Sequence, residues 1–183
     1  MSNRAGQATA FMAITPIVAG KEDELRAYLD GLSQDESPFA LLPRTHFARW
    51  VILDDWNDEK SQPKKDHLLS RYLIFTSNFD GDLSSYLDEL CDKLAPQAGE
   101  LWGRCVGCPD GAAGEALKEY LMHNKINTGF FVAAYPHLRV GDVKRALDTR
   151  ARLIDFAVSS QGMRPAELQS AFNAEFLLTD GSR

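Results

Sequence analysis

Several features are missing from this sequence, and each absence narrows the class of protein. No apolar stretch approaches the ~18 residues that a membrane helix requires, so we expect no membrane partner. Lysine and arginine never form a run longer than a pair such as Lys64-Lys65, and the net charge is −6. Nucleic-acid binding needs a basic face, so we expect no nucleic-acid partner. The opening MSNRAGQATA lacks a charged segment followed by a long apolar one, so we expect no signal peptide and a cytoplasmic, bacterial-type protein.

Cysteine is also scarce, with Cys91, Cys105 and Cys108 as its only occurrences. An odd, small count is typical of reduced thiols rather than of a disulfide framework. The Cys105–Cys108 pair lacks the two further ligands of a structural zinc site. It also ends a predicted strand and enters a turn, whereas a redox dithiol begins a helix. We therefore expect two thiols that flank a bend and hold no metal.

The elements that are present predict an α+β fold. The chain has 183 residues, 44% of them hydrophobic and 25% charged, which fits a globular domain with a sizeable core. Strands are predicted over 11–20, 45–55, 71–81 and 100–111, and helices over 21–32 and 82–96, with a surface loop over 56–70. This β-α-β-β-α-β order is that of the ferredoxin-like fold, an antiparallel sheet with both helices on one face. The opposite face is then left open.

The residues after 111 predict a C-terminal appendage. A helix is expected over 115–124, a strand over 128–136, a longer helix over 140–160 and a short helix from Pro165. They could form half of a second ferredoxin-like unit. We favour a helix-strand-helix appendage over 111–183, packed on a core of 10–110 in one compact domain, because too few strands remain for a second sheet.

The strand THFARW, residues 45–50, places two unusual side chains in the sheet. Regular alternation puts His46 and Arg49 on opposite faces, unless a β-bulge intervenes. A buried guanidinium needs a partner, so we expect Arg49 to form a salt bridge with Asp54, Asp55 or Asp80. A neutral His46 needs no such partner and is expected to face a cavity. The alternative is that both are structural.

Two further segments hold candidate binding residues. In TSNFDGD, residues 76–82, Asn78 and Asp80 share a strand face before a helix start. An anion could bind there, but Asp80 or Asp82 as helix cap is the simpler interpretation. His123 could project into a cavity, or lie solvated at a helix end. The ligand-binding candidates are thus His46, Arg49, Asn78 and His123. No catalytic residues are identified, since no Ser-His-Asp order or phosphate loop is present.

The strings HFARWVILDD, YLIFTSNFDGDLSSYLDEL, VGCP and HNKINTGFFVAAYP resemble a group of largely uncharacterised bacterial proteins. The layout is similar to that of the dimeric α+β barrel superfamily, in which two ferredoxin-like sheets face each other. The resemblance implies a ferredoxin-like fold and a homodimer. The superfamily includes small monooxygenases, haem-dependent chlorite dismutases and dye-decolourising peroxidases. The resemblance to the haem enzymes of this superfamily makes haem a candidate cofactor here. The sequence around the proximal histidine of those enzymes is not matched, however.

Three functions follow from these observations. The leading hypothesis is a small-molecule-binding protein of the α+β barrel type that dimerises through its open sheet face. The second is an oxygenase or peroxidase of the same superfamily, haem-dependent or cofactor-free. The third is a non-catalytic interaction module. One fold hosts many chemistries, so the choice depends on the site.

Overall fold

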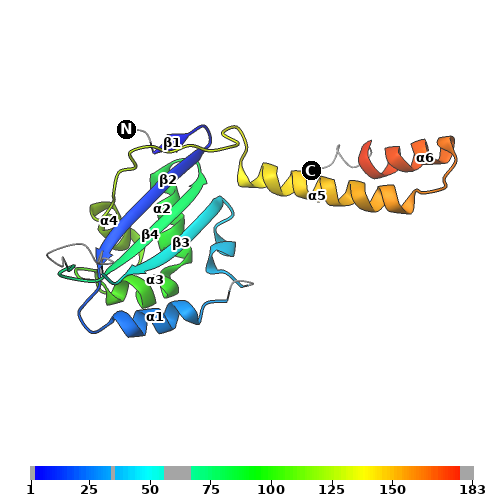
Figure 1. Ribbon diagram of the computed structural model, residues 1–183. Helices are drawn as coiled ribbons and strands as arrows, with labels where there is room; N and C mark the ends of the chain where they lie inside the picture. The colour runs from blue at the N-terminus through cyan, green and yellow to red at the C-terminus, as the bar shows by residue number, and fades with distance from the viewer. Residues whose placement is uncertain (1–2, 34–35, 56–66, 178–183) are drawn as a thin grey trace, which may run out of the picture. The chain divides into compact units, whose positions relative to one another are not determined.

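The computed structural model describes residues 3–33, 36–55 and 67–177, and the chain divides into two compact units, Met1–Gly141 and Asp142–Arg183. The first unit is a mixed α+β structure with a four-stranded antiparallel sheet in the order β1-β2-β4-β3 (Figure 1). The strands are β1 (Arg4–Ala5), β2 (Ala8–Pro16), β3 (Thr45–Leu53) and β4 (Tyr72–Asp80). The three long strands confirm the predicted ones. Residues 56–66 of the expected loop lie outside the described residues.

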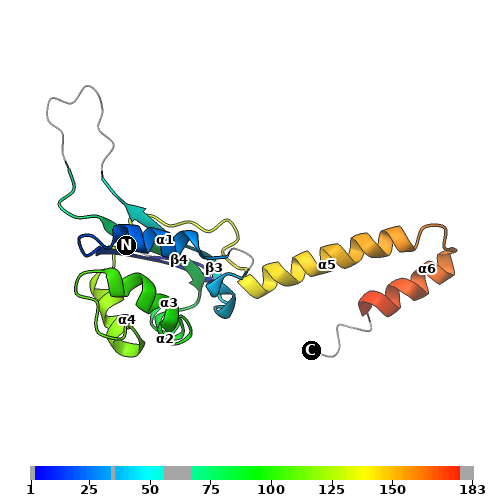
Figure 2. The same cartoon turned by 90° about the horizontal axis from the view of Figure 1, so that it is seen from below.

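Helices cover one face of this sheet. They are α1 (Glu22–Asp30), α2 (Leu83–Lys93), α3 (Ala95–Leu101) and α4 (Gly114–His123), with short 3₁₀ helices over Pro38–Leu41 and Trp102–Arg104. Figure 2 shows α2, α3 and α4 together on one side of the strands. Asp82 caps α2, because its carboxylate accepts the Ser85 backbone N–H at 2.9 Å. α4, which we expected in the appendage, belongs to the first unit.

The core lies between the sheet and these helices. Alternate residues of the strands point into it, among them Phe11, Phe75 and Phe79, each at most 2% exposed. Trp102 meets Phe75 edge to face, with ring centroids 5.4 Å apart. Tyr86 of α2 stacks on Phe79 at 3.7 Å, so one helix face and one strand face interlock through aromatic rings.

The predicted fourth strand over 100–111 is wrong. Residues 95–104 are helical, and only Cys105 makes an isolated bridge, to Ile17. Pro96 does not end a helix, as its position suggests, but occupies the first turn of α3, where its missing N–H costs nothing. The strand expected over 128–136 is also absent, since this described segment has no strand pairing.

Because β1 has only two residues, backbone from three short segments bonds along the outer edge of β2, the first of them continuous with β1. Asn3 O accepts the Ala10 N–H at 2.7 Å. In the middle, Ile14 N–H donates to Asn124 O, and Ile126 N–H donates to Met12 O. At the far end, Val18 and Pro16 bond to residues 104–106 in the same way. The edge is therefore closed by backbone from three distant parts of the chain.

Residues 4–9 form a hairpin at the start of the sheet. Arg4 and Ala5 pair with Thr9 and Ala8 of β2. Gly6 makes the turn with φ of 62°, and a Cβ there would lie 1.9 Å from the carbonyl oxygen of Pro136. Gln7 N–H donates to the same oxygen at 2.8 Å. Only glycine permits this close approach.

The second unit is helical. α5 (Val140–Ser159) starts in the first unit and is followed by α6 (Pro165–Phe172) and a π-helical turn (Asn173–Leu177). Phe156, Phe172 and Phe176 form a small cluster with centroid distances of 4.9–5.7 Å. The helices of 140–160 and from Pro165 confirm the prediction. No helix in the described ranges is long and apolar enough to cross a membrane.

The first prediction concerns the Tyr86 hydroxyl, which is buried between Ser77 Oγ at 2.6 Å and Thr45 Oγ1 at 3.0 Å. Tyr86→Phe leaves both hydroxyls without this partner. We expect the free energy of unfolding in urea to fall by about 1–3 kcal/mol. Tyr135→Phe is the matched control, because Tyr135 is 71% exposed and should change stability by less than about 0.5 kcal/mol. Equal effects of the two substitutions would contradict the assignment.

Candidate functional site

The face of the sheet opposite the helices is the first candidate surface. Within the described part of the first unit, no helix packs on it, and Figure 1 looks onto it, with β2, β4 and β3 in front of α2 and α3. By strand register, its exposed and half-buried side chains include Met12, Ile14, Pro16, Phe47, Arg49, Val51, Tyr72, Ile74, Thr76 and Asn78. Phe47 is 77% exposed, whereas Ala8, Ala10 and Asp80, at one end of the same side of the sheet, are at most 8% exposed. We call the exposed and half-buried set the open face.

A β-bulge places His46 differently from the prediction. Thr45 pairs with Phe79, and Phe47 pairs with Asn78, so His46 is an extra residue without a partner in the register. Its Nε2 lies 2.8 Å from Asp80 Oδ1. Asp80 and Thr76 share one face of β4, and Thr76 is the register partner of Arg49. His46 and Arg49 therefore lie on the same side of the sheet, and the expected opposition is wrong.

Asp80 is the centre of a buried junction. Its residue is 6% exposed, and its second oxygen, Oδ2, accepts the backbone N–H of Val140 at 2.8 Å. Val140 is the first residue of α5, so a carboxylate from the end of β4 satisfies a helix-start donor. His46 completes the junction from β3. These contacts tie His46 into the fold, and they do not support the expectation that it faces a cavity.

Arg49, rather than His46, has donor groups that are not taken up by contacts within the described part of the fold. Its Nε donates to Thr76 Oγ1 at 3.0 Å, and within the described residues it forms no ion pair. The salt bridge expected between Arg49 and a carboxylate is not formed, because the three candidate carboxylates have other partners. Asp80 contacts His46, Asp54 pairs with Arg26, and Asp55 contacts His67. A guanidinium presents five N–H donors, so Arg49 offers several toward the solvent side of the open face.

Asn78 and His123 lie on different elements of the first unit. Asn78 lies on the open face, one alternation from Thr76 and paired with Phe47. His123 is exposed at the end of α4, just before the segment that bonds to the outer edge of β2. β2 lies between that edge and β4, which carries Asn78, and β2 and β4 both lie between it and β3, which carries Arg49. The structure thus groups Arg49 with Asn78, and separates His123 from them.

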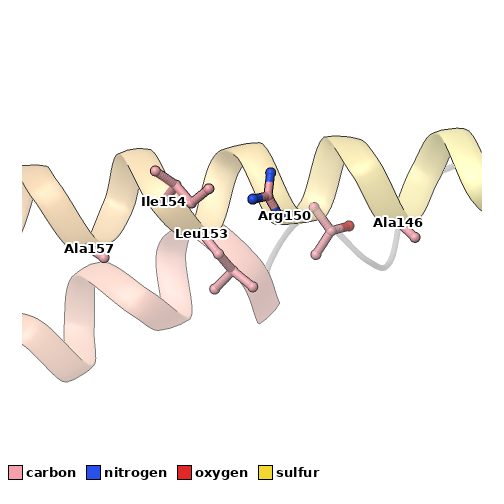
Figure 3. Close-up of a pocket in the computed structure, with 6 residues that line it drawn as sticks. Ala146, Arg150, Leu153, Ile154 and Ala157 are labelled. Atoms are coloured by element: carbon pink, nitrogen blue, oxygen red, sulfur yellow. The ribbon is translucent and has the colours of Figure 1, made fainter.

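A second surface lies on α5 within the second unit. Figure 3 shows a shallow, mostly apolar hollow along this helix. It is lined by Ala146, Thr149, Arg150, Leu153, Ile154 and Ala157. The α6 cluster instead contacts the side of α5 that carries Phe156. The hollow is therefore an open apolar stripe along α5 rather than an enclosed ligand site.

The described side chains do not form a metal site. Across the described ranges, no group of three or more His, Cys, Asp and Glu residues is arranged to hold a metal ion. Of the four histidines, three lie exposed, and His46 is tied through Nε2 to the carboxylate that caps α5. His46 is thus the one histidine that is not exposed, and a contact within the fold occupies its Nε2.

Comparison with known proteins gives no assignment. No protein-family model, no curated protein and no solved structure matches the chain. The side-chain chemistry of the open face therefore carries the interpretation.

The second prediction separates the roles of His46 and Arg49. His46→Ala removes the partner of a buried carboxylate oxygen, so we expect a loss of about 1–3 kcal/mol in the free energy of unfolding. Arg49→Ala removes an exposed contact and should change it by less than about 0.5 kcal/mol. Urea denaturation at one fixed pH measures both. A larger loss for Arg49→Ala would make Arg49 the structural residue of the two.

Proposed function

We propose that this chain is a small-molecule-binding α+β protein whose open face binds a ligand that combines an apolar body with an anionic group. One observation carries the proposal: an exposed arginine on the edge strand β3 lies beside the apolar side chains of the open face, on which no helix of the described first unit packs. The His46–Asp80 junction belongs to the fold rather than to the binding surface.

The composition of the open face supports an apolar ligand body. Met12, Ile14 and Ile74 form a half-buried strip across β2 and β4. Val51 extends it onto β3 with 42% exposure. A contiguous apolar surface of this kind usually marks a binding surface, because water contact with it is unfavourable.

The polar groups support an anionic ligand head. Thr76 holds Arg49 through Nε, which leaves the two terminal nitrogens of the guanidinium to bind a carboxylate or phosphate in the two-pronged geometry that Arg favours. Asn78 lies on the neighbouring register position of β4 and adds an amide donor and acceptor. No carboxylate from the described residues contacts Arg49 to compete with the ligand.

We further propose a homodimer that encloses this site, in the cytoplasm, with a ferredoxin-like fold of the dimeric α+β barrel type. The order β2-β4-β3 supports this fold, since it corresponds to strands one, three and two of a ferredoxin-like sheet. Phe47, 77% exposed, supports a partner copy, because a large aromatic side chain on a sheet face gains most from burial. The resemblance to uncharacterised bacterial proteins of this layout agrees with it.

The third prediction tests the dimer and the ligand together by native mass spectrometry of the purified full chain. We expect a dimer that retains a small anionic molecule. Phe47→Glu should produce monomers, because it places a charge on the proposed interface. Leu41→Glu is the matched control, because Leu41 is 52% exposed on a 3₁₀ helix away from the open face, and should leave the dimer intact.

Arg49→Leu distinguishes ligand binding from assembly. It should keep the dimer and lose the ligand, since it removes the cation but retains an apolar side chain. A wild-type monomer would refute the dimer, and a dimer whose ligand survives Arg49→Leu would refute the binding role of Arg49. A Soret band in the purified protein would favour the haem enzyme instead, and a dimer without any ligand would favour the interaction module.

A further inference from the structure

The segment Cys105-Val106-Gly107-Cys108 is a tight turn that brings two thiols together. Cys108 N–H donates to Cys105 O at 3.4 Å, the bond that closes a β-turn. Gly107 occupies the third position with φ of 74°, the positive value that a type II turn requires there. Turn closure holds the first and fourth Cα atoms within about 7 Å, and a disulfide spans about 4.4–6.8 Å between Cα atoms. The backbone therefore already has a separation that suits a disulfide.

Tyr120 of α4 is hydrogen-bonded to the backbone of this turn. Its hydroxyl donates to Val106 O at 3.0 Å, between the two cysteines. Burial raises the pKa of Tyr120 first, and Cys105 and Cys108 each raise it further. The hydrogen bond from Tyr120 thus holds the backbone between the two cysteines in place.

The two thiols differ in access and in their neighbours. Cys105 is 3% exposed, and its Sγ lies 3.4 Å from Thr15 Oγ1, whereas Cys108 is only half-buried. Burial raises the pKa of Cys105 to about 11, and the Thr15 hydroxyl opposes this rise. Burial also raises the pKa of Cys108. A raised pKa lowers the thiolate fraction at neutral pH and so slows nucleophilic attack by both cysteines. This fits a reversible modification better than a catalytic dithiol.

We propose that Cys105 and Cys108 are a reversible disulfide site whose co-reactant is a small disulfide such as glutathione disulfide. The more accessible Cys108 loses its proton and attacks one sulfur of glutathione disulfide, and the first glutathione leaves as a thiolate that takes up a proton. The Cys105 thiolate then attacks Cys108 Sγ, and the second glutathione leaves in the same way. Two protein thiols are oxidised to one disulfide, and one glutathione disulfide is reduced to two thiols.

A disulfide at this site would affect the hydrogen bonds between the turn and the outer edge of β2. Val106, enclosed by the ring of such a disulfide, donates its N–H to Pro16 O at 2.8 Å, and Ile17 bridges to Cys105. A covalent link across the turn restricts the unfolded chain and so strengthens this closure of β2. The thiol pair does not depend on the ligand proposed for the open face.

The fourth prediction is tested on the native full chain, incubated with glutathione disulfide and then analysed by intact mass and peptide mapping. The chain has three free cysteines before treatment. We expect one thiol to remain, a mass lower by two hydrogen atoms and a Cys105–Cys108 cross-link that dithiothreitol reverses. Cys91→Ser is the matched control and should oxidise like the wild type, because Cys91 is buried in α2.

Two further variants test the order of steps. Cys105→Ser should stop at a glutathione adduct on Cys108. Thr15→Val, which keeps the side-chain shape, should slow the loss of that adduct, because it removes the hydroxyl that lowers the pKa of Cys105. Three thiols left in the wild type, a stable glutathione adduct on it, or a cross-link to Cys91 would each overturn the proposal.

Discussion

The backbone N–H and C=O groups on the outer edge of β2 require hydrogen-bond partners. The arrangement of the first unit depends on how these groups are paired. An exposed strand edge recruits other chains, so proteins pair it or cover it. Here three pieces of backbone pair with it, namely residue 3, residues 104–106 and residues 124–126. They belong to different structural segments: the N-terminal hairpin, the Cys105–Cys108 turn and the end of α4. One requirement thus positions the two thiols, places His123 at the edge, and leaves the opposite edge to β3.

Local patterns predict most of the regular elements, because their signals are contained in the sequence of each element. Alternation identifies β2, β3 and β4, and the helical spacing identifies α1, α2, α4 and α5. The error over 100–111 has a specific cause. Pro96 can end one helix or begin the next, and Leu101, Trp102 and Cys105 are apolar and buried in either structure. Whether this segment forms a strand or a helix depends on the elements against which it packs. Those elements lie elsewhere in the chain, so the local sequence does not reveal them.

The site is predicted less well, because it depends on contacts between strands. The period of two assigns faces only while the register is regular, and the bulge at His46 breaks it. Asp80 is a cap, as its position suggests, but it caps α5 rather than α2, for which Asp82 suffices. The sequence contains a clue to this second cap. Two acidic residues flank Gly81, and the helix that follows needs only one of them as its cap. Asn78 and Arg49 do lie on the open face, although Arg49 lacks the salt bridge expected of it.

The contact of Gly6 and Gln7 with Pro136 has a consequence for the time course of folding. The chain must be synthesised to residue 136 before the N-terminal hairpin can reach its final partner. The central pairs β2–β4 and β3–β4 can form earlier, since their residues all precede 81. The sheet of a nascent chain therefore has one incomplete edge for a large part of translation. Such long-range closure raises the contact order and slows folding, and the unfinished edge is where a chaperone would have most to protect.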